Sequence, residues 1–238
     1  MSARLLALDC STEALAVAAC DGERQSTRTT AGGALASSRI IALALEALAD
    51  CAVPVAQLDA VAFGAGPGAF TGLRCACAVA QGLAFALGKP VLAIDSLMIV
   101  AEASRARLPR GLRELWVAMD ARMHEAYAAQ YRLAQDGHWQ VTSAPALYTL
   151  PALAACWRTT PPHGVAGNAL AAFGERLPDH GVALPDEGVD RAAALLALAR
   201  RAFADGAAIA PQAAAPLYLR DKVALTTAER QARLPSRA

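Results

Sequence analysis

The chain has 238 residues, which is long enough for one large domain or for two small ones with separate cores. Hydrophobic residues make up 55% of the sequence and aromatic residues only 5%, a composition that favours closely packed helices with small contact residues. The 22 basic and 21 acidic residues leave a net charge of +1. This balance argues against a protein that attracts nucleic acid or anionic lipid through its own electrostatic field.

Targeting and redox signals favour a cytoplasmic protein. In the N-terminal region, Asp9 and Glu13 interrupt the apolar run that a secretory signal requires. The most apolar window, Leu73–Leu87, contains Gln81 and Gly82 and is short for a membrane span, so no membrane association is expected. We therefore expect six reduced, structural cysteines: Cys10, Cys20, Cys51, Cys75, Cys77 and Cys156.

In chain order, the first half mixes strands and helices. The D-G dipeptide at residues 21–22 is typical of a hairpin turn between two strands. Ser96 is predicted to cap the start of a helix that reaches Leu108. The expected strands lie at residues 4–10, 14–20, 24–30, 58–63 and 91–95, and the expected helices at 37–51, 71–87 and 96–108.

The pattern begins again after LPRGLRE, residues 108–114, which resembles a linker. A strand ends at Asp120 and a second strand follows a polar turn, much as a strand ends at Asp9 in the first half. Residues 142–162 show a looser pattern, residues 164–170 predict a strand, a glycine turn and a helix, and residues 190–205 predict a helix. The segment PLYLRDKVAL, residues 216–225, is expected to dock on the fold. We predict a duplicated α/β unit, with an N-terminal lobe at 1–108 and a C-terminal lobe at 109–238.

The stretch FGAGPGAFTGLR, residues 63–74, has the usual layout of a phosphate-binding loop between a strand and a helix. A Walker loop has a lysine after its last glycine, which is absent here, and GxGxG departs from the dinucleotide pattern GxGxxG. The backbone N–H groups can bind an anion at the helix N-terminus, or the glycines can let strand and helix pack closely, and both interpretations stay open. The candidate positions are Gly64, Gly66, Gly68, Phe70, Thr71, Gly72 and Arg74.

The helices predicted at 37–51 and 71–87 are apolar nearly all round. A single sheet covers only one face of each helix, so the other face needs a partner, either within the same domain or in another protein. Alanine and glycine at four-residue spacing in the second helix permit close approach of another helix. The residues predicted to form a protein–protein interface are Ile40, Leu43, Ala47, Ala76, Ala80, Leu83, Ala84 and Leu87.

The best enzymatic alternative is a two-lobed phosphotransferase or ATPase. Asp9 and Asp120 would hold a magnesium-bound water in such an enzyme, whereas in the other interpretation each carboxylate caps the turn after its strand. The four histidines stand singly, without H-x-x-x-H or H-E-x-x-H spacing, and G-x-S-x-G is absent. No metal site is therefore predicted, and a metallopeptidase is disfavoured.

Four stretches resemble the TsaB (YeaZ-type) family: LLALDCSTEALAVA, the loop at 63–74 with AVAQGLAFALGKPV after it, DARMHEAY and PLYLR. The resemblance spans about residues 4–225. It implies the α/β actin-like ATPase superfold with two related βββαβα lobes. In this superfold Asp9, Ser11 and Asp120 would be vestigial phosphate-loop positions.

The resemblance also implies a non-catalytic subunit required to form threonylcarbamoyladenosine at adenosine 37 of tRNAs that read A-starting codons. The family pairs with TsaD, which is the transferase, and with the ATPase TsaE, and forms a homodimer when TsaD is absent. The two apolar helices would build the interface. Binding of tRNA, and of any ATP or ADP, is expected only in the assembled complex, so the chain needs no cofactor of its own.

Two positions depart from the family pattern. The region LASSRIIAL lacks the H-x-x-x-H metal motif of TsaD, and Ala36 replaces even the single histidine that TsaB sequences often have there. Leu225 stands where the family often has tryptophan, which leaves the C-terminal segment open. The missing ligands argue against catalysis by this chain independently of the resemblance.

Overall fold

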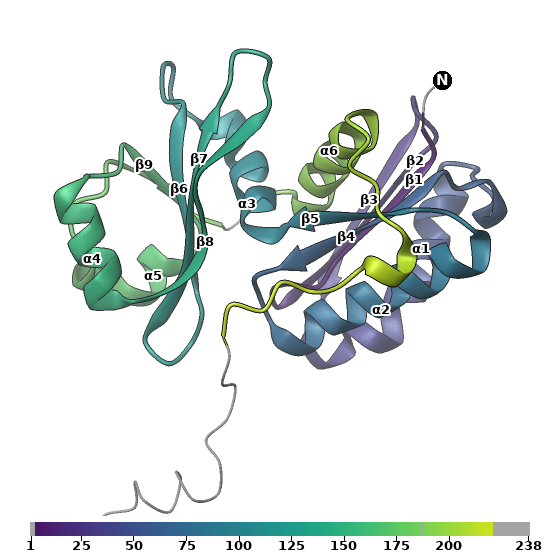
Figure 1. Cartoon of the computed structure of the whole chain (residues 1–238), viewed down its shortest axis with the longest axis horizontal. Coiled ribbons are helices and arrows are strands. Elements are labelled where there is room, and N and C mark those ends of the chain that lie inside the picture. The colour runs from purple at the N-terminus through teal and green to yellow at the C-terminus, as the bar shows by residue number, and fades with distance from the viewer. Residues whose placement is uncertain (1–2, 187, 221–238) are drawn as a thin grey trace, which may run out of the picture.

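A computed structural model describes residues 3–186 and 188–220. The chain forms two five-stranded sheets, one from each half (Figure 1). The first half contains β1 (Leu5–Asp9), β2 (Ala14–Cys20), β3 (Gln25–Ala31), α1 (Ala36–Asp50), β4 (Ala60–Gly66), α2 (Phe70–Leu87), β5 (Val91–Asp95) and α3 (Ser96–Ser104). The second half contains β6 (Glu114–Asp120), β7 (Glu125–Leu133), β8 (Trp139–Thr149), α4 (Leu150–Thr159), β9 (Gly164–Ala166), α5 (Ala169–Phe173), β10 (Val182–Leu184) and α6 (Arg191–Ala204).

The two halves have the same topology, which confirms the predicted duplication. The strand order is β3-β2-β1-β4-β5 in the first sheet and β8-β7-β6-β9-β10 in the second. In both sheets the first three strands are antiparallel neighbours, and the last two run parallel to the first. Asp9 and Asp120 therefore occupy equivalent positions, at the C-terminal ends of the central strands β1 and β6.

The central strands are apolar because both of their faces are covered. In β1, Leu6 and Leu8 contribute to the core beneath α1 and α2, whereas Leu5 and Ala7 contribute to the core between the two sheets. Successive side chains of a strand point to opposite faces, so a strand buried on both sides needs an unbroken apolar run. All six cysteines are free, and four of them are buried.

Each half supplies a helix that packs on the sheet of the other half (Figure 1). Helices α1 and α2 cover one face of the first sheet, and α6, which comes from the second half of the chain, covers its other face. Helix α3 contacts α6 and both sheets, and α4 and α5 lie on the outer face of the second sheet. Each half thus depends on the other for part of its cover.

Helix α3 differs from the prediction at both ends. Asp95, and not Ser96, caps it: Asp95 Oδ1 accepts hydrogen bonds from the backbone N–H groups of Leu97 at 2.9 Å and Met98 at 3.4 Å. The helix ends at Ser104 instead of Leu108. The Ser96 hydroxyl is used elsewhere, as the acceptor of a hydrogen bond from the Gly66 N–H at 2.9 Å.

Residues 142–162, for which the sequence pattern predicted no definite element, contain the end of β8 and all of α4. Pro145 is compatible with β8 because this strand lies at the edge of its sheet, where one side makes no ladder hydrogen bonds. Pro151 lies in the first turn of α4, where a missing N–H breaks no helical bond. The Thr149 hydroxyl caps this helix by accepting from Ala152 N–H at 3.4 Å.

Candidate functional site

The glycine loop between β4 and α2 packs directly on the turn that follows β1. A Cβ atom added at Gly72 would lie 1.8 Å from the carbonyl oxygen of Cys10, and one at Gly68 would lie 2.4 Å from that of Ser11. The Ala69 N–H donates to the Ser11 carbonyl oxygen at 2.7 Å. Close packing of backbone on backbone is therefore the reason for these two glycines.

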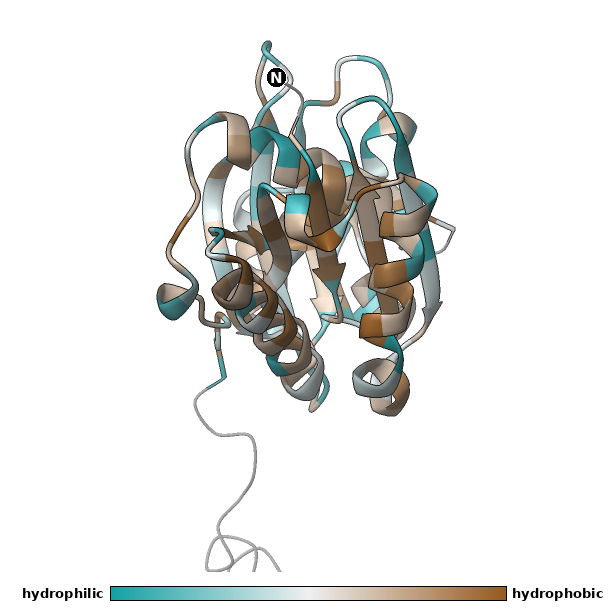
Figure 2. Ribbon diagram, turned by 90° about the vertical axis from the view of Figure 1, so that its right-hand side faces the viewer, coloured by the Kyte–Doolittle hydropathy of each residue, from teal (hydrophilic) through white to brown (hydrophobic). Residues whose placement is uncertain are grey.

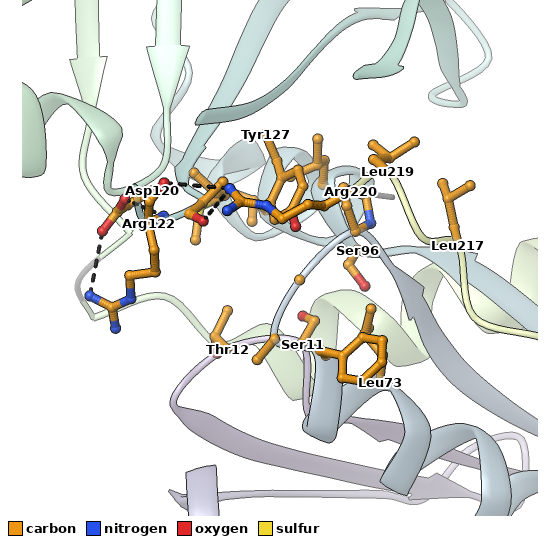
Figure 3. A pocket seen from close by; sticks show the side chains of 18 of the residues that line it. Ser11, Thr12, Leu73, Ser96, Asp120, Arg122, Tyr127, Leu217, Leu219 and Arg220 are labelled. Atoms are coloured by element: carbon orange, nitrogen blue, oxygen red, sulfur yellow. Dashed lines mark hydrogen bonds and ion pairs between the residues drawn. The ribbon is translucent and has the colours of Figure 1, made fainter. Parts of the chain in front are cut away.

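A cavity of about 350 Å³ lies between the two halves, beside this loop (Figure 3). It brings together Ser11 and Thr12, from the turn after β1, and Asp120, the last residue of β6. Leu73, at the start of α2, gives it an apolar wall. The predicted phosphate-loop positions thus do converge, except that Asp9 itself is buried behind the cavity, with an exposed fraction of 1%.

Asp9 is held by Arg191, a residue that the sequence analysis did not single out. Arg191 Nη2 donates to Asp9 Oδ2 and to the Ser11 hydroxyl, both at 3.0 Å. Asp9 also accepts from the Ser11 N–H at 3.0 Å and from its hydroxyl at 3.1 Å. Arg191 is 5% exposed, and its Nη1 lies 3.6 Å from Asp186 Oδ1. Burial raises the pKa of Asp186.

This arrangement does not fit a magnesium-binding role for Asp9. Three of the roughly four acceptor positions of the carboxylate are already used. The guanidinium at 3.0 Å supplies the positive charge that a metal ion would supply, and would repel such an ion.

Asp120 caps the turn after β6. Its Oδ1 accepts from the Arg122 N–H at 2.8 Å, just as Asp9 accepts from the N–H two residues later. The turn is tight: Arg122, Met123 and His124 all have positive φ angles, of 65°, 55° and 58°. The Arg122 side chain reaches across to Glu13 of the first half at 3.2 Å, in an exposed ion pair. Both aspartates therefore have the capping role that was one of the two predicted alternatives.

The residues exposed on α1 and α2 are mostly not those that the sequence predicted for the interface. Five residues predicted at an interface are instead fully buried between their own helices and the first sheet, so this assignment was wrong: Ile40, Ala47, Ala76, Ala80 and Ala84. A spacing of seven residues in α1 and of four in α2 places them on the face of each helix that packs on the first sheet. The other three residues assigned to the interface are partly exposed: Leu43, Leu83 and Leu87.

The outward faces of α1 and α2 are also apolar (Figure 2). Ile41 is 54% exposed, Leu45 52% and Phe85 65%, and the exposed Ala78 and Gly82 lie between Arg74 and Phe85 along α2. By length and composition alone α2, with 18 residues and a mean hydropathy of 1.4, could cross a membrane, but six of its residues are buried in the fold.

The segment at residues 207–220, called the strap below, runs beside α2 (Figure 1). Its end reaches the cavity, where Arg220 forms an ion pair with Glu125 of β7 at 2.6 Å. Within residues 216–220 the predicted terminal segment is therefore docked, and residues 221–225, with Leu225, lie outside the described residues. Six of the nine large exposed hydrophobic residues of the described chain lie on α1, α2, the strap or the residue before α1: Leu35, Ile41, Leu45, Phe85, Leu217 and Tyr218.

The fold and cleft define a protein of the actin-like ATPase superfold, in which two halves of equal topology face each other across a cavity. The chain is 30% identical to the tRNA threonylcarbamoyladenosine biosynthesis protein TsaB of Escherichia coli over 230 residues, which are 93% of this chain and 96% of that one. It belongs to the TsaB family.

Other similarities agree with this assignment. The Haemophilus influenzae TsaB is 39% identical over 126 residues, about half of each chain. Two solved structures from Pseudomonas aeruginosa, YeaZ and a protein similar to peptidase YeaZ, are 37% and 38% identical, cover 92% of this chain and all of their own, and have TM-scores of 0.81 and 0.83. Residues 34–149 match the sequence model of the TsaD family, tRNA N6-adenosine threonylcarbamoyltransferase.

Proposed function

We propose that this chain is a non-catalytic subunit for formation of threonylcarbamoyladenosine in tRNA, and that it acts by binding TsaD. The names of its relatives support the process, since two of them are tRNA threonylcarbamoyladenosine biosynthesis proteins. The single observation that carries the mode of action is the exposed apolar surface of α1 and α2. Surfaces of this kind on a folded chain mark sites of protein–protein contact.

TsaD is a suitable partner for this surface because part of this chain is similar to the TsaD family. The TsaD family match at residues 34–149 includes both α1 and α2, so a TsaD protein has a corresponding segment. Two similar helix pairs can pack face to face as a pseudo-symmetric bundle, and the small residues Ala78 and Gly82 let α2 approach closely. A second copy of this chain offers the same helix pair, which accounts for a homodimer when TsaD is absent.

The cleft supports the non-catalytic part of the proposal. Asp9, which a phosphotransferase would need, is buried and already paired with Arg191. Asp120 is engaged in capping its own turn. These contacts favour a structural use of the former phosphate loops.

The remaining partners follow from the complex and not from this chain alone. In our proposal TsaE joins the TsaB–TsaD pair, and ATP or ADP is bound in that assembly. With a net charge of +1, this chain has little electrostatic attraction for tRNA, so tRNA is held through the complex. In this proposal the modification reaction takes place in the cytoplasm and involves no membrane.

The test is the formation of threonylcarbamoyladenosine on tRNA, with TsaD, TsaE and the adenylate-making enzyme of the same organism, with and without this chain. We expect product only when the chain is added. The variant Asp120→Asn should support the same yield, because an asparagine oxygen can still accept the hydrogen bond from the Arg122 N–H. Full product formation without the chain would overturn the proposal, and loss of product with Asp120→Asn would overturn its non-catalytic part.

A further inference from the structure

The strap adds a third apolar element beside α2. Residues 207–219 contain no charged side chain, and Leu217 and Tyr218 are 42% and 41% exposed. Gln81 Nε2 of α2 donates to the Pro211 carbonyl oxygen at 2.8 Å, which joins the two elements directly. The surface formed by α1 and α2 therefore continues across α2 onto the strap.

Hydrogen bonds fix the strap along its length, although it has little regular structure. Ile209 and Val91 exchange two backbone hydrogen bonds of 2.9 Å at the edge of the first sheet. The Leu217 N–H donates to the Ala65 carbonyl oxygen at 2.7 Å. A surface that is already ordered loses little conformational entropy when a partner binds.

The aromatic end of the strap is fixed to the first turn of α2. The Tyr218 ring lies 5.1 Å from the Phe70 ring, and its hydroxyl accepts from Arg74 Nε at 3.0 Å. The Arg74 guanidinium also lies 3.9 Å from the centre of the Phe70 ring, at cation–π distance. The strap therefore contacts α2 near both ends of the helix, through Pro211 and through Tyr218.

A groove of about 440 Å³ separates the C-terminal end of α2 from the strap. Phe85 lies at one side and Ala210 at the other, and both are exposed. Lys89 is the one charged residue that lines the groove. Asp59 is near enough to interact with its charge, but neither Asp59 nor any other carboxylate of the described residues forms an ion pair with it. The groove therefore suits an apolar segment that carries an acidic residue.

The TsaD match suggests why such a groove matters. It ends at residue 149, so it includes the helix pair but not the strap. A helix pair that two proteins share offers two similar partners, a second copy of this chain and TsaD, and specificity between them requires a difference in affinity. The strap is the described part of this surface that lies outside the match and can supply that difference.

Building on the proposed function, we infer that the groove between α2 and the strap determines specificity for TsaD. Its occupant is an apolar TsaD segment outside the shared helix pair, with an acidic residue placed against Lys89. Self-association uses the helix pair and leaves the groove empty.

The variant Ala210→Arg tests this inference, because it places a long charged side chain in the groove at an exposed position. We expect the dissociation constant for TsaD to rise at least about tenfold, while that for self-association changes less than about threefold. Calorimetric titration with TsaD and analytical ultracentrifugation measure the two constants. The matched control is Ala155→Arg, at an exposed alanine on α4, which should change neither. Melting temperatures within about 2 °C of the parent confirm that both variants are folded.

A second variant separates this inference from the proposed function. Leu45→Glu places a charge on the exposed face of α1 and should weaken both TsaD binding and self-association. If Leu45→Glu weakens TsaD binding and Ala210→Arg does not, the groove inference is wrong and the helix surface stands. If Leu45→Glu leaves TsaD binding intact, the proposed function fails at its interface. Equal weakening of both associations by Ala210→Arg would make the groove a general contact and overturn its role in specificity.

Discussion

Arg191 carries a charge that is almost entirely withdrawn from water. A buried ion pair, taken as a unit, contributes little net stability to the folded state, because the desolvation of both charges opposes their attraction. Removing one partner is different, since the other charge then remains buried without compensation. Asp9 is the residue at risk, because its exposed fraction is only 1%.

We expect Arg191→Met to lower the free energy of unfolding by about 3–5 kcal/mol, since Asp9 would lose its counter-ion. The double variant with Asp9→Asn should recover part of this loss, because no unpaired charge would remain. Urea denaturation of the parent, the single variant and the double variant measures the effect. A single-variant loss below about 1 kcal/mol would show that water or another cation compensates Asp9.

The sequence permitted only half of this site to be predicted. Asp9 and Asp120 were identifiable because each ends an apolar strand and precedes a polar turn, a local pattern. Arg191 was not identifiable, because it is 182 residues from Asp9 and meets it only through the packing of α6 on β1. No local signal distinguishes Arg191 from the other arginines of the chain.

For the helices α1 and α2, the sequence predicted the position along the chain but not which face is buried. Their extents were predicted to within one residue at each end, since apolar runs and glycine punctuation are local features. Their orientation was not predictable, because a helix that is apolar all round has no polar stripe to mark its outer face. Alanine at four-residue spacing occurs on both faces of α2, and the buried set was mistaken for the exposed one.

A pair of substitutions in α2 tests this corrected orientation. Ala78→Arg, at an exposed position, should leave the fold intact and weaken TsaD binding at least about tenfold. Ala80→Arg, at a fully buried position against the sheet, should prevent folding, because it adds both volume and an unpaired charge to the core. Circular dichroism and a TsaD binding assay distinguish the two. A well-folded Ala80→Arg protein would contradict the assigned orientation.

At the scale of the whole molecule, the duplicated halves are not independent. The duplication was predictable from the repeated strand, aspartate and hairpin. The packing of α6 on the first sheet was not predictable, because α6 belongs to the second half of the sequence. The boundary at residues 108 and 109 remains a prediction about sequence units.

A polypeptide of residues 1–108 should therefore not fold alone. Without α6, the inner face of the first sheet, which includes Leu5, Ala7 and Leu92, would lose most of its cover. Nuclear magnetic resonance of the isolated fragment should show a poorly dispersed spectrum, and co-expression with residues 109–238 should restore a folded complex. A cooperatively folded isolated fragment would contradict this expectation.

The packing of α6 also has a consequence for synthesis on the ribosome. The strands β1 to β5 are complete by Asp95, but the helix that covers their inner face ends only at Ala204. The apolar side chains of this inner face therefore stay uncovered while more than a hundred further residues are translated. Such faces bind one another and aggregate. We therefore expect chaperones that act during translation to bind this chain before α6 is made.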